Sequence, residues 1–175
     1  AYRLIHGEGD YVSGLVIDVY NSAAVIQAHT MGIYLLREMI SDALKQVFPA
    51  LKTIYFNSEV KGKEIPNEFL FGESAQDTIT ENGALFEVNW VEGQKTGFFI
   101  DQRENRLLVQ QVAKGKTVLN TFAYSGGFSV HALLGGASKV VSIDISKKAM
   151  ELSDKNVALN KLKNHQSLVG DVFEF

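Results

Sequence analysis

The residues best suited to chemistry lie between Val118 and Asp144, in the segment VLNTFAYSGGFSVHALLGGASKVVSID. This pattern predicts a strand, a tight turn at Gly126 and a helix over 128–134. A second strand over 139–143 then ends on Asp144. Parallel β-α-β units bind ligands beyond the carboxyl ends of their strands. We therefore expect the N–H groups of the turn and the carboxylate of Asp144 to share one site, where the acid can accept hydrogen bonds from a ribose diol.

The turn also discriminates between adenosine-containing cofactors. Dinucleotide sites use G-x-G-x-x-G because a pyrophosphate needs bare backbone around it. Phe122 and Tyr124 stand where glycine would be expected, and their side chains would block a diphosphate. A cofactor without phosphates tolerates them better, which favours S-adenosylmethionine (SAM). The alternative is a β-α-β unit whose glycines serve only helix packing.

Composition describes an ordinary globular chain. Its 175 residues suit one or two domains, and 46% are hydrophobic and 21% charged. No apolar run approaches about 18 residues and no signal peptide is visible, so we expect no membrane span and a cytoplasmic location. Cysteine is absent, which excludes disulfides within this stretch, and the four histidines show neither metal spacing nor a triad with a serine.

Charge bears on the partners. The net charge is −3, whereas a protein that binds nucleic acid by itself is usually basic. Any RNA contact is therefore expected to come mostly from segments outside this chain. The chain begins on Ala1 rather than methionine, and we expect it to be a fragment of a longer protein.

The first part of the chain, residues 1–75, predicts a small α+β domain. Strands over 15–19 and 24–28 form a hairpin, and an apolar face recurs from Ile33 to Val47 at helical spacing. A further strand is expected over 53–56. Lys61 to Ser74 is polar and glycine-bearing, which is typical of a loop or linker.

The second part, residues 76–175, begins with a β-hairpin over 77–91 around Asn82-Gly83, a strong turn signal. A helix is expected over 101–113 with Asp101 as N-cap. Beyond the central unit, Ser146 is expected to cap a helix with Ala149, Leu152, Asn156 and Leu159 on one face, followed by a third strand over 167–169. This alternation indicates an α/β fold with a parallel, doubly wound sheet.

Several motifs together resemble one family. They are RLIHGEGDYVSGLVIDVY at 3–20, KTGFFIDQRENR at 95–106, the central segment at 118–144 and NVALNKL at 156–162. The chain resembles the SAM-dependent methyltransferases that modify cytosine carbon-5 in large-subunit (23S) rRNA. That resemblance implies a Rossmann-like class I methyltransferase sheet, here partial, preceded by the family's small α+β domain.

The resemblance also implies a set of cofactor-binding positions. Residues of the turn would lie under the methionine part of SAM, Asp144 would hold the ribose and Asp171 would accept from the adenine amino group. Residues before and within the first helix of this part would close the site. The full set is Thr96, Phe99, Gln102, Asn120, Phe122, Tyr124, Ser125, Gly126, Asp144, Ile145, Asp171, Val172 and Phe173.

Other interpretations stay open beside it. Guanine-modifying relatives share the central motif, so guanine is the alternative methylated base. A nucleotide-binding oxidoreductase domain and a non-catalytic RNA-binding module are alternatives from other classes. Arg103 and Arg106 could orient their helix or reach RNA phosphate, but surface ion pairs are the commoner role. Asn156 is expected to be a satisfied buried amide.

Methylation of a pyrimidine carbon sets a further condition. That carbon is a poor nucleophile, and the resembled family activates it with a cysteine thiolate that adds to the ring. These 175 residues contain no cysteine. We expect the chain to hold part of the SAM site, to lack a catalytic residue and to be inactive alone. An unpaired sheet edge would also favour a homodimer.

Overall fold

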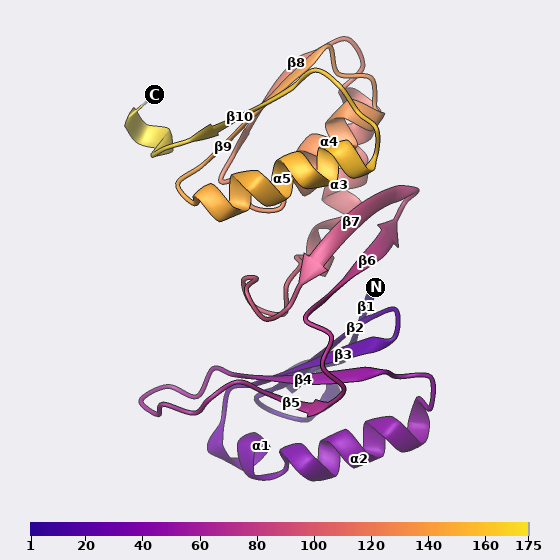
Figure 1. Ribbon diagram of the computed structural model, residues 1–175, viewed down its shortest axis with the longest axis vertical. Helices are drawn as coiled ribbons and strands as arrows, with labels where there is room; N and C mark the ends of the chain where they lie inside the picture. The colour runs from indigo at the N-terminus through magenta and orange to yellow at the C-terminus, as the bar shows by residue number, and fades with distance from the viewer. Residues whose placement is uncertain (175) are drawn as a thin grey trace. The chain divides into compact units, whose positions relative to one another are not determined.

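The computed structural model describes residues 1–174 and divides into two compact units (Figure 1). Unit 1 comprises Ala1–Ile79 and Val88–Ile100. Unit 2 comprises Thr80–Glu87 and the chain from Asp101 onward. Each unit therefore consists of two separate segments of the chain. A single domain boundary after residue 75 was expected from the sequence.

Unit 1 is built on a five-stranded mixed sheet. Its strands, in spatial order, are β1 (Tyr2–His6), β2 (Leu15–Tyr20), β3 (Ala23–Ala28), β4 (Thr53–Ser58) and β5 (Glu68–Phe71). Only β3 and β4 pair in parallel, and the chain between them passes through α1 (Met31–Leu35) and α2 (Arg37–Val47). A short 3-10 helix, η1 (Gly7–Asp10), joins β1 to β2. The predicted hairpin of 15–19 with 24–28 is confirmed as β2 and β3.

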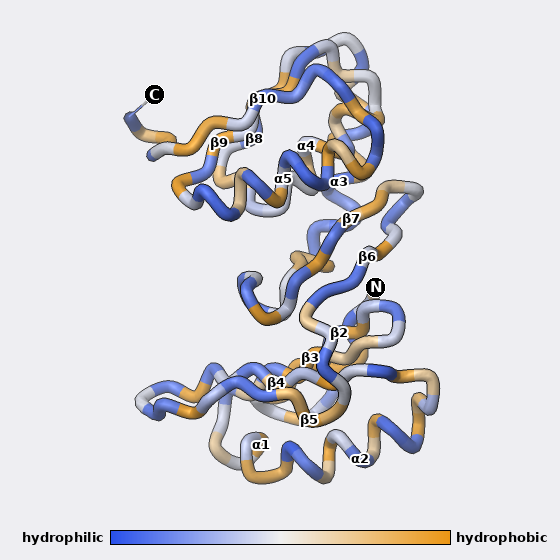
Figure 2. The backbone as a smooth tube through the Cα atoms, viewed as in Figure 1, coloured by the Kyte–Doolittle hydropathy of each residue, from blue (hydrophilic) through white to orange (hydrophobic). Residues whose placement is uncertain are grey.

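The helices of unit 1 cover one face of this sheet. Leu44 of α2 packs in one core with Ile17, Ile26 and Phe56, and these three strand side chains are at most 1% exposed. Figure 2 shows hydrophilic and hydrophobic residues alternating along α2. The expected single helix is broken at Leu36, where α1 ends and α2 begins, so the expected apolar face is only partly correct.

One expectation for unit 1 is wrong. The segment taken for a loop contains β5, which pairs antiparallel with β4. Its exposure pattern alternates, and Arg37 donates to Glu68 at 2.7 Å from the neighbouring helix. The strand was missed because only four residues pair at the edge of the sheet, within a polar stretch.

Buried contacts explain why Val88–Ile100 belongs to unit 1. Trp90 stacks on Tyr20 with ring centroids 6.2 Å apart. Thr96 Oγ1 donates to Asp18 Oδ2 at 2.6 Å, and Arg3 donates to both oxygens of the same carboxylate. Since Asp18 is fully buried, these partners are what make its charge tolerable.

Unit 2 contains a three-stranded parallel sheet. Its strands are β8 (Thr117–Thr121), β9 (Lys139–Asp144) and β10 (His165–Val169), in the order β10-β9-β8. Its helices are α3 (Arg103–Val112), α4 (Gly127–Leu134) and α5 (Lys147–Leu159), with 3-10 turns η2 (Ile100–Gln102) before α3 and η3 (Val172–Glu174) after β10. The α/β class and the parallel sheet are confirmed. Within residues 1–174, no helix is long and apolar enough to cross a membrane.

A hairpin belongs to both units. Strands β6 (Gln76–Glu81) and β7 (Ala84–Asn89) meet at Asn82 and Gly83, whose φ angles of 48° and 82° suit a type I′ turn, as predicted. The turn and adjoining residues, Thr80–Glu87, are part of unit 2. They therefore supply unit 2 with backbone groups and one buried acid.

Two expectations for α3 are corrected. The helix begins at Arg103 with Gln102 as N-cap and no side-chain capping bond, so Asp101 is not the cap. Its apolar Leu108 and Val112 are exposed, whereas Arg106 is only 2% exposed. Arg106 is thus a buried residue and not a surface ion-pair residue or an RNA contact.

The partner of Arg106 is Glu81 at the end of β6. Arg106 donates to both carboxylate oxygens, at 2.6 and 2.8 Å, and Arg103 lies 3.4 Å from one of them. His131 Nε2 lies 3.6 Å from Glu81 Oε1. Burial alone would raise the pKa of Glu81, but the interactions with His131 and Arg106 outweigh it and lower the pKa from 4.5 to about 2.

This cluster predicts acid sensitivity. A carboxylate with a depressed pKa in the folded state stabilises the fold above pH 4.5, and that contribution is lost as the pH falls from 4.5 towards 2. The shift corresponds to about 3 kcal/mol at about 1.4 kcal/mol per unit. Urea unfolding at about pH 6 and about pH 3 should show a larger loss of unfolding free energy in the unmodified chain than in Glu81→Gln.

A matched control is Glu151→Gln, which removes a carboxylate whose side chain is 64% exposed. It should keep the pH dependence of the unmodified chain. If Glu81→Gln and the unmodified chain lose the same unfolding free energy between the two pH values, Glu81 is not the source of the acid sensitivity.

Candidate cofactor site

The turn between β8 and α4 has an unusual backbone. Phe122, Tyr124 and Gly126 all have positive φ angles, of 55°, 45° and 71°. For residues other than glycine this left-handed conformation costs about 1–2 kcal/mol each. Backbone strain retained by two aromatic residues is a feature of sites where the side chains are needed.

Asp144 holds this turn in place. Its Oδ2 accepts a hydrogen bond from the Tyr124 backbone N–H at 3.0 Å, and its Oδ1 accepts from Ser146 N–H at 2.9 Å. An ionised carboxylate can accept about four hydrogen bonds. Asp144 is only partly buried, so each oxygen keeps acceptor capacity for a ligand hydroxyl. The acid predicted from sequence at the end of β9 is therefore in contact with the predicted turn.

Helix α5 packs directly against the turn. A Cβ atom added to Gly126 would lie 2.9 Å from Ser153 Cβ and 3.0 Å from Ser153 Cα. Both residues are buried, and Ser125 beside them is 5% exposed. Glycine is required at 126 both for its φ angle and for this close approach.

Apolar side chains stand exposed after the ends of the strands. Phe122, Ile145 and Phe173 are 64%, 74% and 86% exposed, and the rings of Phe122 and Phe173 lie 6.1 Å apart. Nearby, Asp171 Oδ1 accepts from the Phe173 backbone N–H at 3.0 Å. Exposed aromatic and aliphatic groups beside hydrogen-bond acceptors suit a flat, partly polar ring such as adenine.

A chain of polar groups lies under the parallel sheet. Asn120 Nδ2 donates to Ser129 Oγ at 2.8 Å, and Ser129 and Ser142 share a hydrogen bond of 2.7 Å. Ser142 in turn bonds His165 Nε2 at 2.7 Å, and His165 Nδ1 lies 3.1 Å from Asp154 Oδ1. The side chain of Asn120 is thus oriented from beneath the site.

This series of hydrogen-bonded side chains contradicts the expectation that no histidine forms a triad with a serine. Ser142, His165 and Asp154 have that connectivity, but Ser142 and Ser129 are fully buried. No substrate carbonyl can reach Ser142 Oγ, so the arrangement is structural. Burial lowers the pKa of His165 and outweighs the opposing effect of Asp154, so the imidazole is neutral at neutral pH.

The expected site residues fall into two groups. Those in unit 2 are Gln102, Asn120, Phe122, Tyr124, Ser125, Gly126, Asp144, Ile145, Asp171, Val172 and Phe173. The loop residues among them follow the ends of β8, β9 and β10, while Gln102 bonds Asp101 and Asn105 at the start of α3. Thr96 and Phe99 belong to unit 1, and their role in a cofactor site stays a prediction.

The buried face of α5 agrees only in part with the face predicted from the sequence. Ala149 and Asn156, expected on that face, are buried together with Met150, Ser153 and Val157, whereas Leu152 and Leu159 are half-buried or exposed. The helical spacing of Met150, Ser153 and Val157 is the sequence signal for the three residues that were missed. Asn156 donates to the Ser125 carbonyl at 2.9 Å and so belongs to the site.

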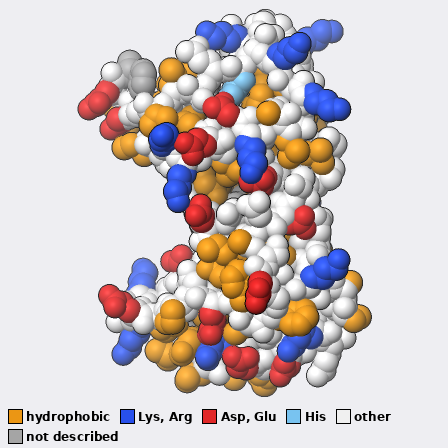
Figure 3. Space-filling view, viewed as in Figure 1, with side chains coloured by type: hydrophobic (Ala, Val, Ile, Leu, Met, Phe, Trp, Pro, Cys, Tyr) orange, Lys and Arg blue, Asp and Glu red, His pale blue; other side chains and the backbone are white. Residues whose placement is uncertain are grey.

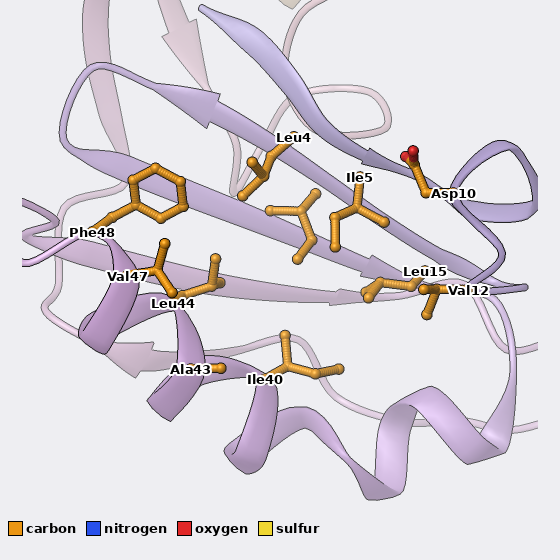
Figure 4. Close-up of a pocket in the computed structure, with 11 residues that line it drawn as sticks. Leu4, Ile5, Asp10, Val12, Leu15, Ile40, Ala43, Leu44, Val47 and Phe48 are labelled. Atoms are coloured by element: carbon orange, nitrogen blue, oxygen red, sulfur yellow. The ribbon is translucent and has the colours of Figure 1, made fainter.

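Unit 1 contains a separate apolar groove of about 520 Å³ (Figure 4). It lies between α2 and strands β1 and β2, and Asp10 is its one acidic lining residue. None of the expected cofactor residues lines it. Within the described part of the chain, no group of three or more His, Cys, Asp or Glu side chains could hold a metal ion.

The face of the molecule shown in Figure 3 has no single basic patch. On the face shown in Figure 3, lysine and arginine side chains are interspersed with aspartate and glutamate. This agrees with the net charge of −3. This face therefore lacks the cluster of basic side chains by which proteins bind a nucleic-acid backbone independently of sequence.

A parallel β-α-β sheet with a strained turn and a strand-end acid at one edge defines a Rossmann-like unit for an adenosine cofactor. A profile of the S-adenosylmethionine-dependent methyltransferases matches residues 60–172, and the chain belongs to this family. The expectation of a SAM-dependent methyltransferase, and with it the cofactor class, is confirmed.

Similar proteins agree with this assignment. Ribosomal RNA large subunit methyltransferase I of Tolumonas auensis is 39% identical over 93% of the chain and 43% of its own length. SMU.776, solved in complex with SAH (S-adenosylhomocysteine), is 35% identical with a TM-score of 0.89, over 99% of the chain and 46% of that structure. A tRNA m1G37 methyltransferase of M. jannaschii is 26% identical with a TM-score of 0.75, over 94% and 52%. The chain spans about half the length of the curated relatives it matches.

The packing of Gly126 predicts a specific stability loss. Gly126→Ala should lower the unfolding free energy by more than Gly115→Ala, because both glycines have φ of 71° but only Gly126 meets Ser153. The strain shared by both variants is about 1 kcal/mol, and the overlap at Gly126 should add about 1–3 kcal/mol. Chemical denaturation of the two variants measures the difference. Equal losses would show that α5 yields freely and that close packing does not fix the turn.

Proposed function

We propose that the turn from Asn120 to Gly126 and the carboxylate of Asp144 bind SAM. The observation that carries this proposal is the double role of Asp144, which accepts the Tyr124 N–H and still has acceptor capacity for a ribose diol. The exposed Phe122, Ile145 and Phe173 would contact the adenine ring. When bound, SAM supplies an electrophilic methyl group. The chain's own residues bind and orient it.

Removal of the charge at Asp144 tests this site. Asp144→Asn should weaken the binding of SAM and SAH about tenfold or more, equivalent to about 1.4 kcal/mol, because a neutral amide is a weaker acceptor for ribose hydroxyls. Glu151→Gln is the control, since it removes an exposed carboxylate of α5 that pairs with Lys147 and belongs neither to the turn nor to the polar groups that orient Asn120. Isothermal titration calorimetry measures both. Unchanged affinity in Asp144→Asn would refute the site.

For the substrate, we propose large-subunit rRNA, with cytosine carbon-5 as the methylated atom. The names of the relatives support rRNA as the substrate class. The resemblance of the motifs to cytosine-modifying enzymes supports the base. The similarity to a tRNA m1G37 methyltransferase favours guanine as the second candidate.

The proposed chemistry requires more than these 175 residues provide. A pyrimidine carbon becomes nucleophilic when a thiolate adds to the ring, and this chain contains no cysteine. We therefore propose that it supplies the methyl-donor site and that the nucleophile comes from residues outside it. Contact with rRNA through other segments, a cytoplasmic location and self-association through an open sheet edge extend the same proposal.

A transfer assay addresses these points together. With methyl-labelled SAM and large-subunit rRNA, the 175-residue chain should bind SAM and leave the RNA unlabelled. Label on cytosine would contradict the assignment of the nucleophile to other residues, and label on guanine would exchange the proposed base for the second candidate. Sedimentation of the chain over a range of concentrations tests self-association, and a constant monomer mass would contradict it.

A further inference from the structure

Asn156 connects two segments of unit 2 that are far apart in sequence. Its Oδ1 accepts from the Glu87 backbone N–H of β7 at 2.8 Å. Its Nδ2 donates to the backbone carbonyl of Ser125, in the turn, at 2.9 Å. The residue is fully buried, so neither bond is exchanged with water at the surface.

Asn160, one helical turn later, makes a parallel contact with the same strand. Its Oδ1 accepts from Leu85 N–H at 2.8 Å and its Nδ2 donates to Leu85 carbonyl at 2.7 Å. Four residues of helix rise about 6 Å and two residues of strand about 6.6 Å, so the two asparagines match alternate residues of β7. Asn160 does not touch the turn.

The bond to Ser125 fixes more than one carbonyl. In a trans peptide the C=O of one residue and the N–H of the next point in opposite directions from one plane. Orienting the Ser125 carbonyl therefore orients Gly126 N–H, which donates to the Ala123 carbonyl at 2.8 Å. That bond closes the turn around Tyr124, whose N–H reaches Asp144.

We propose that Asn156 is a positioning residue for the cofactor turn. It sets the Ser125–Gly126 peptide plane from the backbone of β7 and so couples the hairpin turn region, Thr80–Glu87, to cofactor binding. This inference rests on the proposed SAM site. By thermodynamic reciprocity, a cofactor that stabilises the turn also stabilises the bond from Asn156 to Glu87.

Two aspartate variants separate positioning from simple folding. Asn156→Asp keeps an acceptor for Glu87 N–H but loses the donor to Ser125 and places a carboxylate oxygen against that carbonyl. Asn160→Asp makes the same chemical change against Leu85 without affecting the turn. The affinity for SAH, measured by calorimetry, should fall about tenfold in Asn156→Asp and less than about twofold in Asn160→Asp. The Tm should fall by a similar amount in both variants.

The outcomes distinguish the inference from the proposed function. An unmodified chain that binds no SAH overturns the SAM site and the inference with it. An unmodified chain that binds SAH, beside two variants with equal affinity, overturns the inference alone.

A second measurement needs no variant and remains valid if Asn156→Asp does not fold. Amide hydrogen exchange of the unmodified chain, with and without SAH, should slow more at Glu87 N–H than at Leu85 N–H. Equal slowing at the two amides would overturn the coupling, because the N–H of Leu85 bonds Asn160 whereas the N–H of Glu87 bonds Asn156.

Discussion

The structure of unit 2 depends on how the carboxylate of Asp144 restrains the turn after β8. Phe122 and Tyr124 hold left-handed backbone conformations that aromatic residues rarely adopt. The bond from Tyr124 N–H to Asp144 offsets part of that strain, and the packing of Ser153 on Gly126 prevents the turn from relaxing towards α5. A rigid turn with the exposed Phe122 would lower the ordering cost of binding the proposed cofactor.

Buried polar groups hold the rest of unit 2 around this turn. Glu81 and Arg106 form a buried ion pair, and Asn156 and Asn160 satisfy backbone groups of β7 in place of a neighbouring strand. Each such group would cost about 1–3 kcal/mol if left without its partner. These hydrogen bonds connect the hairpin turn region, helix α5 and the turn after β8. They are the contacts through which the proposed coupling would act.

The sequence by itself determined the arrangement of strands and helices in unit 2. Hydrophobic periodicity marked β8, α4, β9 and α5, and Asn82-Gly83 marked the hairpin, because these signals depend on neighbours along the chain. The motifs around residues 95–106 and 118–144 also identified the family that the profile match confirms. The contact of Asp144 with the turn was predictable from the sequence, because a strand-end acid after such a turn has a defined position in parallel sheets.

Tertiary structure alone decided which polar residues are buried. Arg106 was expected to be a surface residue and Asn156 a satisfied buried amide, and the partners of both lie far away in sequence. The break at Leu36, the short edge strand β5 and the return of Val88–Ile100 to unit 1 likewise depend on contacts that no local pattern records. The physical reason is that burying a polar group is favourable only beside its partner, and the fold, not the neighbouring residues, supplies that partner.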